Sequence, residues 1–253
     1  MTIASRTLVA FSALALLSAC GGDSSVSPTS TPVSLTQVFD EMSFPSRTGT
    51  AGARAGISAT AFAGPRIPTG CSYAIASQSF VCAPITVGGL TITQSYTLLD
   101  AAGAPLAAFD ANALSAVRMQ SAVSGTETAT DITITLDGRD DETLSGLRGS
   151  THTLIGTSTM TSTTTSSAGF GAQTISDTSK TTTNLVIPAN ATAATYPLSG
   201  TITTEMTGGA RFLPGPPETI VMTFNGTSKV KITMNGVALS GCSTFDLATA
   251  SCS

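Results

Sequence analysis

The sequence has few of the residues that most often carry chemistry. Its 253 residues include no tryptophan, one histidine and only 10% charged residues, and its formal net charge is −4. Eleven lysines and arginines over this length provide no basic surface for nucleic acid. A zinc site is excluded as well, because it needs histidines or closely spaced cysteines, and here the cysteines are widely spaced. We therefore expect no nucleic-acid partner and no zinc.

The motifs of common catalytic sites are also missing. A Ser/His/Asp triad would have to use His152, yet no G-x-S-x-G elbow occurs, and the residues around His152 predict an exposed strand. Ser228 and Lys231 formally match S-x-x-K, but residues three apart in a strand point to opposite faces. The phosphate-binding glycine loops are absent too. We expect a protein that is not an enzyme and holds no cofactor.

One group of acidic residues invites comparison with a calcium site. Residues 136–146, LDGRDDETLSG, predict a turn in which four acids gather: Asp137, Asp140, Asp141 and Glu142. Their spacing is not that of an EF-hand, and Arg139 stands among them. We interpret the segment as a solvated turn without a metal.

The N-terminus carries export signals. Arg6 and Thr7 precede residues 8–19, an apolar segment well short of the roughly 20 residues of a membrane-spanning helix, so residues 1–19 predict a signal peptide. Residues 17–20, Leu-Ser-Ala-Cys, resemble the lipobox of bacterial lipoproteins. The resemblance implies that Cys20 is acylated, with chains such as palmitate, and becomes the first mature residue. Ordinary cleavage after Ala19 is the alternative.

The same resemblance implies that the protein is located in the cell envelope. An aspartate directly after the lipobox cysteine tends to retain such lipoproteins at the inner membrane, and Gly21 stands there instead. The resemblance therefore implies the outer membrane, on its periplasmic or surface face. Residues 20–33, rich in Ser, Thr and Pro, then predict a flexible tether between lipid and domain.

Setting Cys20 aside leaves an even number of cysteines: Cys71, Cys82, Cys242 and Cys252. The envelope is oxidising enough for disulfides to persist. Four cysteines permit three connectivities, and the sequence does not settle which one forms. We favour Cys71 with Cys82 and Cys242 with Cys252, since each pair brackets a short turn; cross-pairing between the chain's two ends is the alternative.

Residues 34–253 predict a single β-rich domain that begins with a helix. Residues 34–44 have a capping-box pair, Ser34 and Gln37, and an apolar face at helical spacing, while residues 46–70 predict a loop. From Cys71 onward the hydrophobic period is two, which is typical of strands. The long Thr/Ser segments 151–165 and 173–187 have few large apolar residues, so we expect them to extend beyond the core or to form a weakly buried edge.

Turn residues predict three hairpin registers. In residues 71–82 a tight turn would place Cys71 opposite Cys82 and Tyr73 opposite Phe80. Asn235-Gly236 predicts a type I′ turn in which Met234 meets Val237 and Ile232 meets Leu239. A three-residue loop over residues 225–227 would pair Met222 with Val230 and Ile220 with Ile232.

The predicted fold is mainly all-β: an antiparallel meander of roughly eight to ten strands with one short N-terminal helix, forming a curved sheet, half-barrel or barrel. The threonine-rich, alternating sequence resembles that of uncharacterised Thr-rich β-meander lipoproteins of bacterial envelopes. This resemblance implies a type of fold and no activity. We expect a non-enzymatic structural or protein-binding module. The alternative is a carrier of an apolar ligand or lipid, in a lipocalin-like cavity lined by four residues: Ile92, Ile134, Met222 and Ile232.

Overall fold

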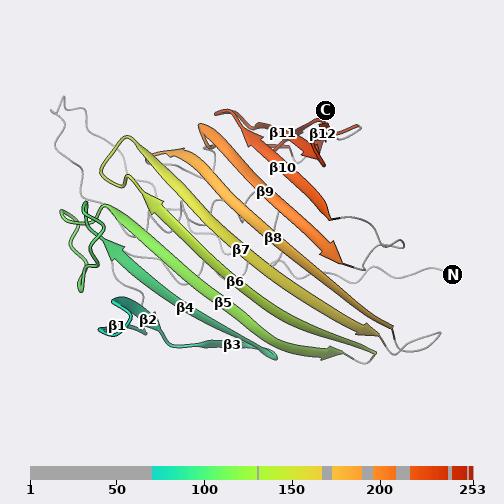
Figure 1. The fold of residues 1–253 in the computed structure, drawn as a ribbon, viewed down its shortest axis with the longest axis horizontal. Coiled ribbons are helices and arrows are strands. Elements are labelled where there is room, and N and C mark those ends of the chain that lie inside the picture. Colours follow the sequence, from blue (N-terminus) through green and yellow to red (C-terminus); the bar gives the residue numbers. More distant parts are fainter. Residues whose placement is uncertain are drawn as a thin grey trace.

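A computed structural model describes residues 70–129, 131–166, 173–189, 196–208, 217–238, 241–249 and 251–252. The predicted signal peptide, Cys20, the tether and the helix over residues 34–44 lie outside the described residues. Fourteen antiparallel strands in this part of the chain form one curved sheet that does not close (Figure 1). The prediction of an antiparallel β-meander is confirmed.

Eight strands have six or more residues and form the body of the sheet: β4 (Leu90–Leu99), β5 (Ala116–Ala129), β6 (Ile132–Ser145), β7 (Thr151–Ser166), β8 (Gln173–Pro188), β9 (Ser199–Gly208), β10 (Glu218–Phe224) and β11 (Lys229–Met234). Six shorter strands complete it: β1 (Cys71–Ala74), β2 (Ser79–Cys82), β3 (Ile85–Val87), β12 (Val237–Ala238), β13 (Thr244–Asp246) and β14 (Ser251–Cys252). From β4 to β11 each strand pairs with its neighbours in sequence, and β1 and β14 end the path.

The prediction of a turn over residues 136–146 is wrong. β6 continues through this segment to Ser145 and pairs with β5 on one side and β7 on the other. Leu136 and Leu144 lie an even number of residues apart and therefore face the same way, as a continuous strand requires. Two neighbouring strands supply partners for the backbone, and this tertiary pairing outweighs the local turn preference of the charged residues.

The expectation for the two Thr/Ser segments is corrected in one respect. β7 and β8 are central strands of the sheet, between β6 and β9, and not an edge. Leu154 and Leu185 are fully buried register partners near one end of the ribbon. Most of the buried apolar residues of the ribbon lie at that end, and threonine and serine fill most of the remaining length, where β-branched side chains suit a pleated surface.

The hydrophobic core lies on one face of the sheet, which we call the core face. The strand register aligns one buried apolar side chain from each of five consecutive strands into a row: Leu98, Val117, Leu144, Leu154 and Leu185. Loop residues pack against the same cluster, among them Leu114 and Leu147. The core thus forms from residues that are distant in sequence but occupy one level of the sheet.

The predicted Cys71–Cys82 hairpin and both favoured disulfides are present. Cys71 pairs with Cys82 in a disulfide, and the Tyr73 and Phe80 rings contact edge to face with centroids 5.3 Å apart. Cys242 and Cys252 form the second disulfide. The favoured connectivity is therefore the one present.

The type I′ turn near the C-terminal end is also present. Asn235 and Gly236 have φ values of 52° and 79°, as this turn requires at both central residues, and Met234 lies opposite Val237. The second predicted pair includes Leu239, which lies outside the described residues.

The predicted register of the preceding hairpin is wrong by two residues. Met222 lies opposite Ile232, and Ile220 lies opposite Met234. The connection is longer than predicted because Asn225 and Thr227 form an extra local turn: the Asn225 side-chain oxygen accepts hydrogen bonds from the Thr227 amide and hydroxyl, at 3.2 and 2.7 Å. The shift is an even number of residues, so each side chain keeps its predicted face.

Candidate functional site

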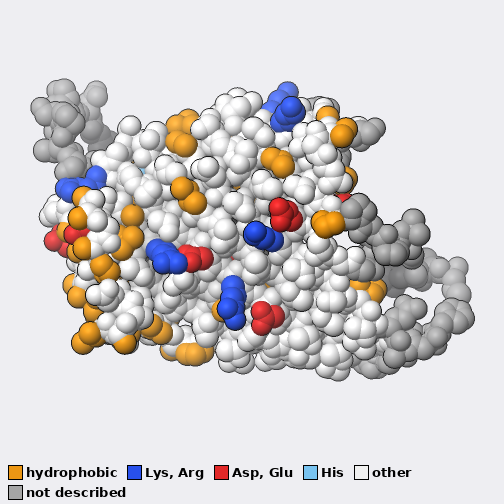
Figure 2. Space-filling view, in the orientation of Figure 1, with side chains coloured by type: hydrophobic (Ala, Val, Ile, Leu, Met, Phe, Trp, Pro, Cys, Tyr) orange, Lys and Arg blue, Asp and Glu red, His pale blue; other side chains and the backbone are white. Residues whose placement is uncertain are grey.

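The opposite side of the sheet, which we call the polar face, is covered by hydroxyl groups. Figure 2 shows this face, where a few charged and scattered hydrophobic side chains stand among backbone and side chains of other kinds. Hydroxyl pairs bridge adjacent strands along it, including Thr161 with Thr178 and Thr165 with Thr174, each at 3.2 Å. This surface needs no covering layer to satisfy its side chains.

A groove of about 660 Å³ lies on the polar face over β2, β4, β5, β6 and β7. Eight of its sixteen lining residues are serine or threonine, two are glutamine, two arginine and two aspartate, and only Val81 and Ala122 are apolar. Strand alternation directs the side chains of three of the sixteen, Gln94, Ser121 and Asp140, toward the core face.

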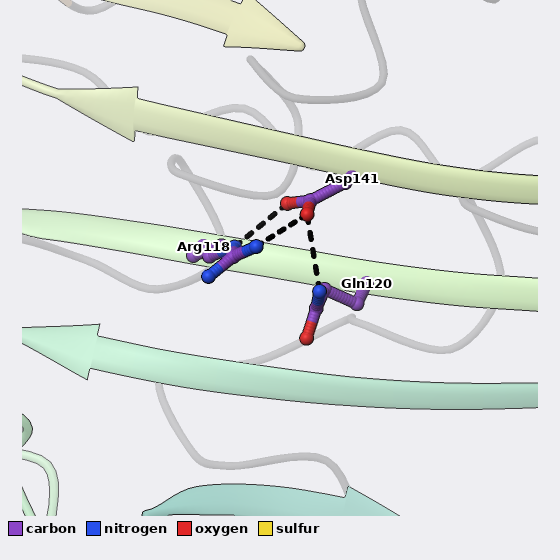
Figure 3. A network of polar contacts seen from close by, with 3 residues as sticks. All are labelled: Arg118, Gln120 and Asp141. Carbon is purple, nitrogen blue, oxygen red and sulfur yellow. Dashed lines mark hydrogen bonds and ion pairs between the residues drawn. The ribbon is translucent and has the colours of Figure 1, made fainter. Parts of the chain in front are cut away.

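An ion pair and an amide belong to the lining of the groove, and Figure 3 shows their contacts. Arg118, on β5, donates from Nε to Oδ1 of Asp141 on β6 at 2.7 Å and from Nη2 to Oδ2. Gln120, two residues along β5, donates from Nε2 to the same Oδ2 at 3.1 Å. The register produces this arrangement, because it sets Gln120 directly opposite Asp141. The three side chains form one fork of donors and acceptors.

The ion pair fixes the charge state of both partners. The hydrogen bonds from Arg118 hold the pKa of the Asp141 carboxylate below its usual value, against the smaller opposing effect of burial. The same hydrogen bond raises the pKa of Arg118. Both side chains stay partly exposed, at 46% for Arg118 and 37% for Asp141, so solvent can be replaced by a ligand at either one. Together they contribute no net charge to the groove.

Arg139 is the second arginine of the groove. It lies on the polar face of β6, two residues from Asp141, with Ala122 and Thr159 as its cross-strand neighbours. Its side chain is exposed, and in the part of the chain that the structure describes no hydrogen bond or ion pair engages it. Asp137, the next residue along on the same face, lies outside the groove lining. Arg139 is therefore the groove arginine that has no ion pair among the described residues, whereas Arg118 is paired with Asp141.

The four residues predicted to line an apolar cavity are not gathered at one place. Met222 and Ile232 are register partners; Met222 is buried, and Ile232 packs against the core. Ile92 is half-buried beside Val123 at the other side of the sheet. Ile134 is 38% exposed and lies near the first residue of β6. On the described residues these side chains belong to separate parts of one face.

The prediction of an exposed His152 is wrong. Its side chain is only 3% exposed and lies on the core face, opposite Ile187 and two residues before Leu154. The sequence around it is rich in threonine, which suggested solvent on both sides. Its position near the core end of β7, however, places it level with buried aliphatic residues.

The four acids thought to share a turn are separated by strand alternation. Asp137 and Asp141 lie on the polar face, while Asp140 and Glu142 lie on the core face. Glu142 is buried between Met119 and Gly156. Among the described residues, no three or more His, Cys, Asp or Glu side chains come close enough to hold a metal ion.

The groove was missed from the sequence, although a signal for it existed. Read as a strand, residues 137–143 alternate Asp137, Arg139 and Asp141 on one face. That reading would have placed two of the groove's charged side chains together. Their meeting with Arg118 and Gln120 depends on the β5–β6 register, which no local pattern specifies.

Comparisons of this chain with protein-family models, curated proteins and solved structures found no match. Over the described ranges, no helix has the length and apolar character needed to cross a membrane.

Proposed function

We propose that this protein is a membrane-anchored lipoprotein of the bacterial cell envelope and that its β domain is a non-enzymatic structural or binding module. The observation that carries the proposal is the cysteine pairing. Cys71–Cys82 and Cys242–Cys252 leave Cys20, in its Leu-Ser-Ala-Cys setting, as the cysteine outside these disulfides. Two disulfides favour an oxidising compartment, and a cysteine at the end of a signal peptide favours acylation.

The polar face supports a binding role. Its groove presents donors and acceptors fixed on central strands, where main-chain pairing on both sides limits their movement. A carrier of apolar ligands would instead need a mostly hydrophobic cavity, and only two of the sixteen lining residues are apolar. The groove therefore favours recognition of a polar partner.

The anchor is tested by replacing its attachment point. In Cys20→Ala we expect the protein to move from the membrane fraction to the soluble fraction and to lose incorporation of a labelled palmitate analogue. Several acyl chains hold a protein firmly, at about 0.8 kcal/mol per buried CH₂, so their loss should release most of it.

A matched control separates anchoring from folding. Cys71→Ala with Cys82→Ala removes two cysteines from the β domain but leaves Cys20 in place, and this variant should remain acylated and membrane-bound. A Cys20→Ala protein that stays in the membrane fraction would refute the anchor.

A further inference from the structure

We infer that the groove on the polar face binds an acidic saccharide, with sugar hydroxyls on the Arg118–Gln120–Asp141 fork and a carboxylate on Arg139. The inference rests on the proposed function, since a domain displayed from an envelope membrane meets the polysaccharides of that envelope. It goes further by naming the ligand class and the role of each charged side chain.

The lining matches the hydrogen bonding of a sugar. Serine and threonine hydroxyls both donate and accept, as sugar hydroxyls do, and seven of the thirteen lining side chains directed into the groove carry one. Arg118 uses two of its five N–H donors on Asp141, which leaves the others for a ligand. Within the described residues the Gln120 carbonyl oxygen also has no protein donor.

The site is ordered before any ligand arrives. Arg118 and Asp141 hold each other through two hydrogen bonds, and Gln120 is tied to the same carboxylate (Figure 3). Holding a long side chain in its bound rotamer in advance removes an entropic penalty from binding. The volume of about 660 Å³ falls in the range of small-ligand sites, about 300–1,000 Å³.

Charge selects an acidic sugar over a neutral one. Arg118 is neutralised by Asp141, whereas Arg139 is exposed and has no partner among the described residues. The lining contains two arginines and two aspartates, so the preference for an acidic ligand rests on Arg139, the arginine without an ion pair. A guanidinium binds a carboxylate with two parallel hydrogen bonds, which gives both affinity and orientation.

A protein partner fits the same surface less well. The centres of protein interfaces are enriched in aromatic residues and methionine and exclude water from apolar pockets. No aromatic residue or methionine lines this groove, and its two apolar residues, Val81 and Ala122, are small.

The test uses the full-length chain, purified in mild detergent, and pairs of matched probes. Oligomers of galacturonate, mannuronate and sialic acid are each compared with their carboxyl-reduced neutral counterparts by calorimetric titration, and polyglutamate serves as an anionic peptide. We expect at least one acidic oligosaccharide to bind about tenfold more tightly than its neutral counterpart, the value of one charge-assisted hydrogen-bonded contact. Polyglutamate should bind more weakly than that sugar.

Three variants assign the roles. Arg139→Gln should remove the preference for the acidic form and leave the weaker neutral binding, while Gln120→Ala should weaken both forms. Lys231→Gln is the matched control, because Lys231 is also an exposed cation on the polar face but lies on β11, outside the groove. It should bind like the unaltered protein.

Several outcomes would overturn the inference: no binding of any acidic oligosaccharide at millimolar concentration, equal affinity for both members of every pair, tighter binding of polyglutamate, or an equal loss in Lys231→Gln. Membrane fractionation of the same preparations keeps the two proposals apart. An anchored protein that binds no sugar contradicts the ligand alone, and a sugar-binding protein that is soluble with Cys20 intact contradicts the anchor alone.

Discussion

Arg118 and Asp141 illustrate how much a surface ion pair contributes to this fold. Both groups are more than a third exposed, so water and salt screen their attraction. Their value lies in orientation, because two hydrogen bonds define where each donor and acceptor of the groove stands. Stability and recognition can therefore be separated by substitution at this pair.

Asp141→Asn should lower the free energy of unfolding only slightly, by less than about 1 kcal/mol at neutral pH. The folded state depresses the pKa of Asp141, so its contribution is present above the unfolded value, about 3.9, and is lost as pH falls through the folded pKa. Urea unfolding at several pH values checks this: the difference from the unaltered protein should vanish in acid.

Asp137→Asn is the control for that measurement. Asp137 lies on the same face of β6 and has no ion pair among the described residues, so its replacement should change stability less at neutral pH. If both variants show the same loss, the Arg118 contact is not its cause.

Gly156 shows a second residue-level constraint, because it makes room for a buried carboxylate. A Cβ added there would stand 2.5 Å from Cγ of Glu142 and 3.0 Å from the main-chain oxygen of Asp141. The glycine is therefore required by the close approach of two strands, and it explains how Glu142 fits among core residues.

Gly156→Ala should lower the free energy of unfolding by roughly 1–3 kcal/mol, as overpacking in a core does. Thr157→Ala, one residue along and on the exposed polar face, should stay within about 0.5 kcal/mol. Urea unfolding of the two variants gives the comparison. An unchanged Gly156→Ala protein would show that β6 and β7 separate easily at this level.

At the scale of elements, local sequence patterns predicted the parts whose partners are close in the chain. The Cys71–Cys82 hairpin and the Asn235-Gly236 turn follow from turn residues and face matching over a few positions. The second half of β6 was missed because its strand character comes from pairing with β5 and β7, and the groove was missed because five strands build it. Long-range pairing, unlike a turn, has no short signature.

The two disulfides close loops of similar length but differ in surroundings. Removing either by paired serine substitution should cost about 2–3 kcal/mol by loop entropy. The Cys71–Cys82 variant should lose more, because Phe80 of that hairpin is buried in the core, whereas Phe245 and Leu247 of the second loop are only partly buried against it. Urea unfolding in oxidising buffer tests the order. A larger loss for Cys242 and Cys252 would contradict it.

The described part of the chain is a single open sheet, and the two ends of its strand path are short strands. The described path ends in β1, four residues long, and β14, two residues long, and each carries a disulfide cysteine. Short, cross-linked edge strands offer little template for pairing with another chain. The long strands lie between these two ends, so their backbone groups are paired within the sheet and are not available to another chain.

The sequential order of the strands has a consequence for how the chain reaches its fold. From β4 to β11 each strand pairs with the strands next to it in sequence, so none of these pairings joins strands that are far apart in the chain. Contacts of this kind close small loops and favour rapid folding. A chain delivered from its N-terminal end, by synthesis or through a translocation pore, can add one ribbon at a time to a growing sheet.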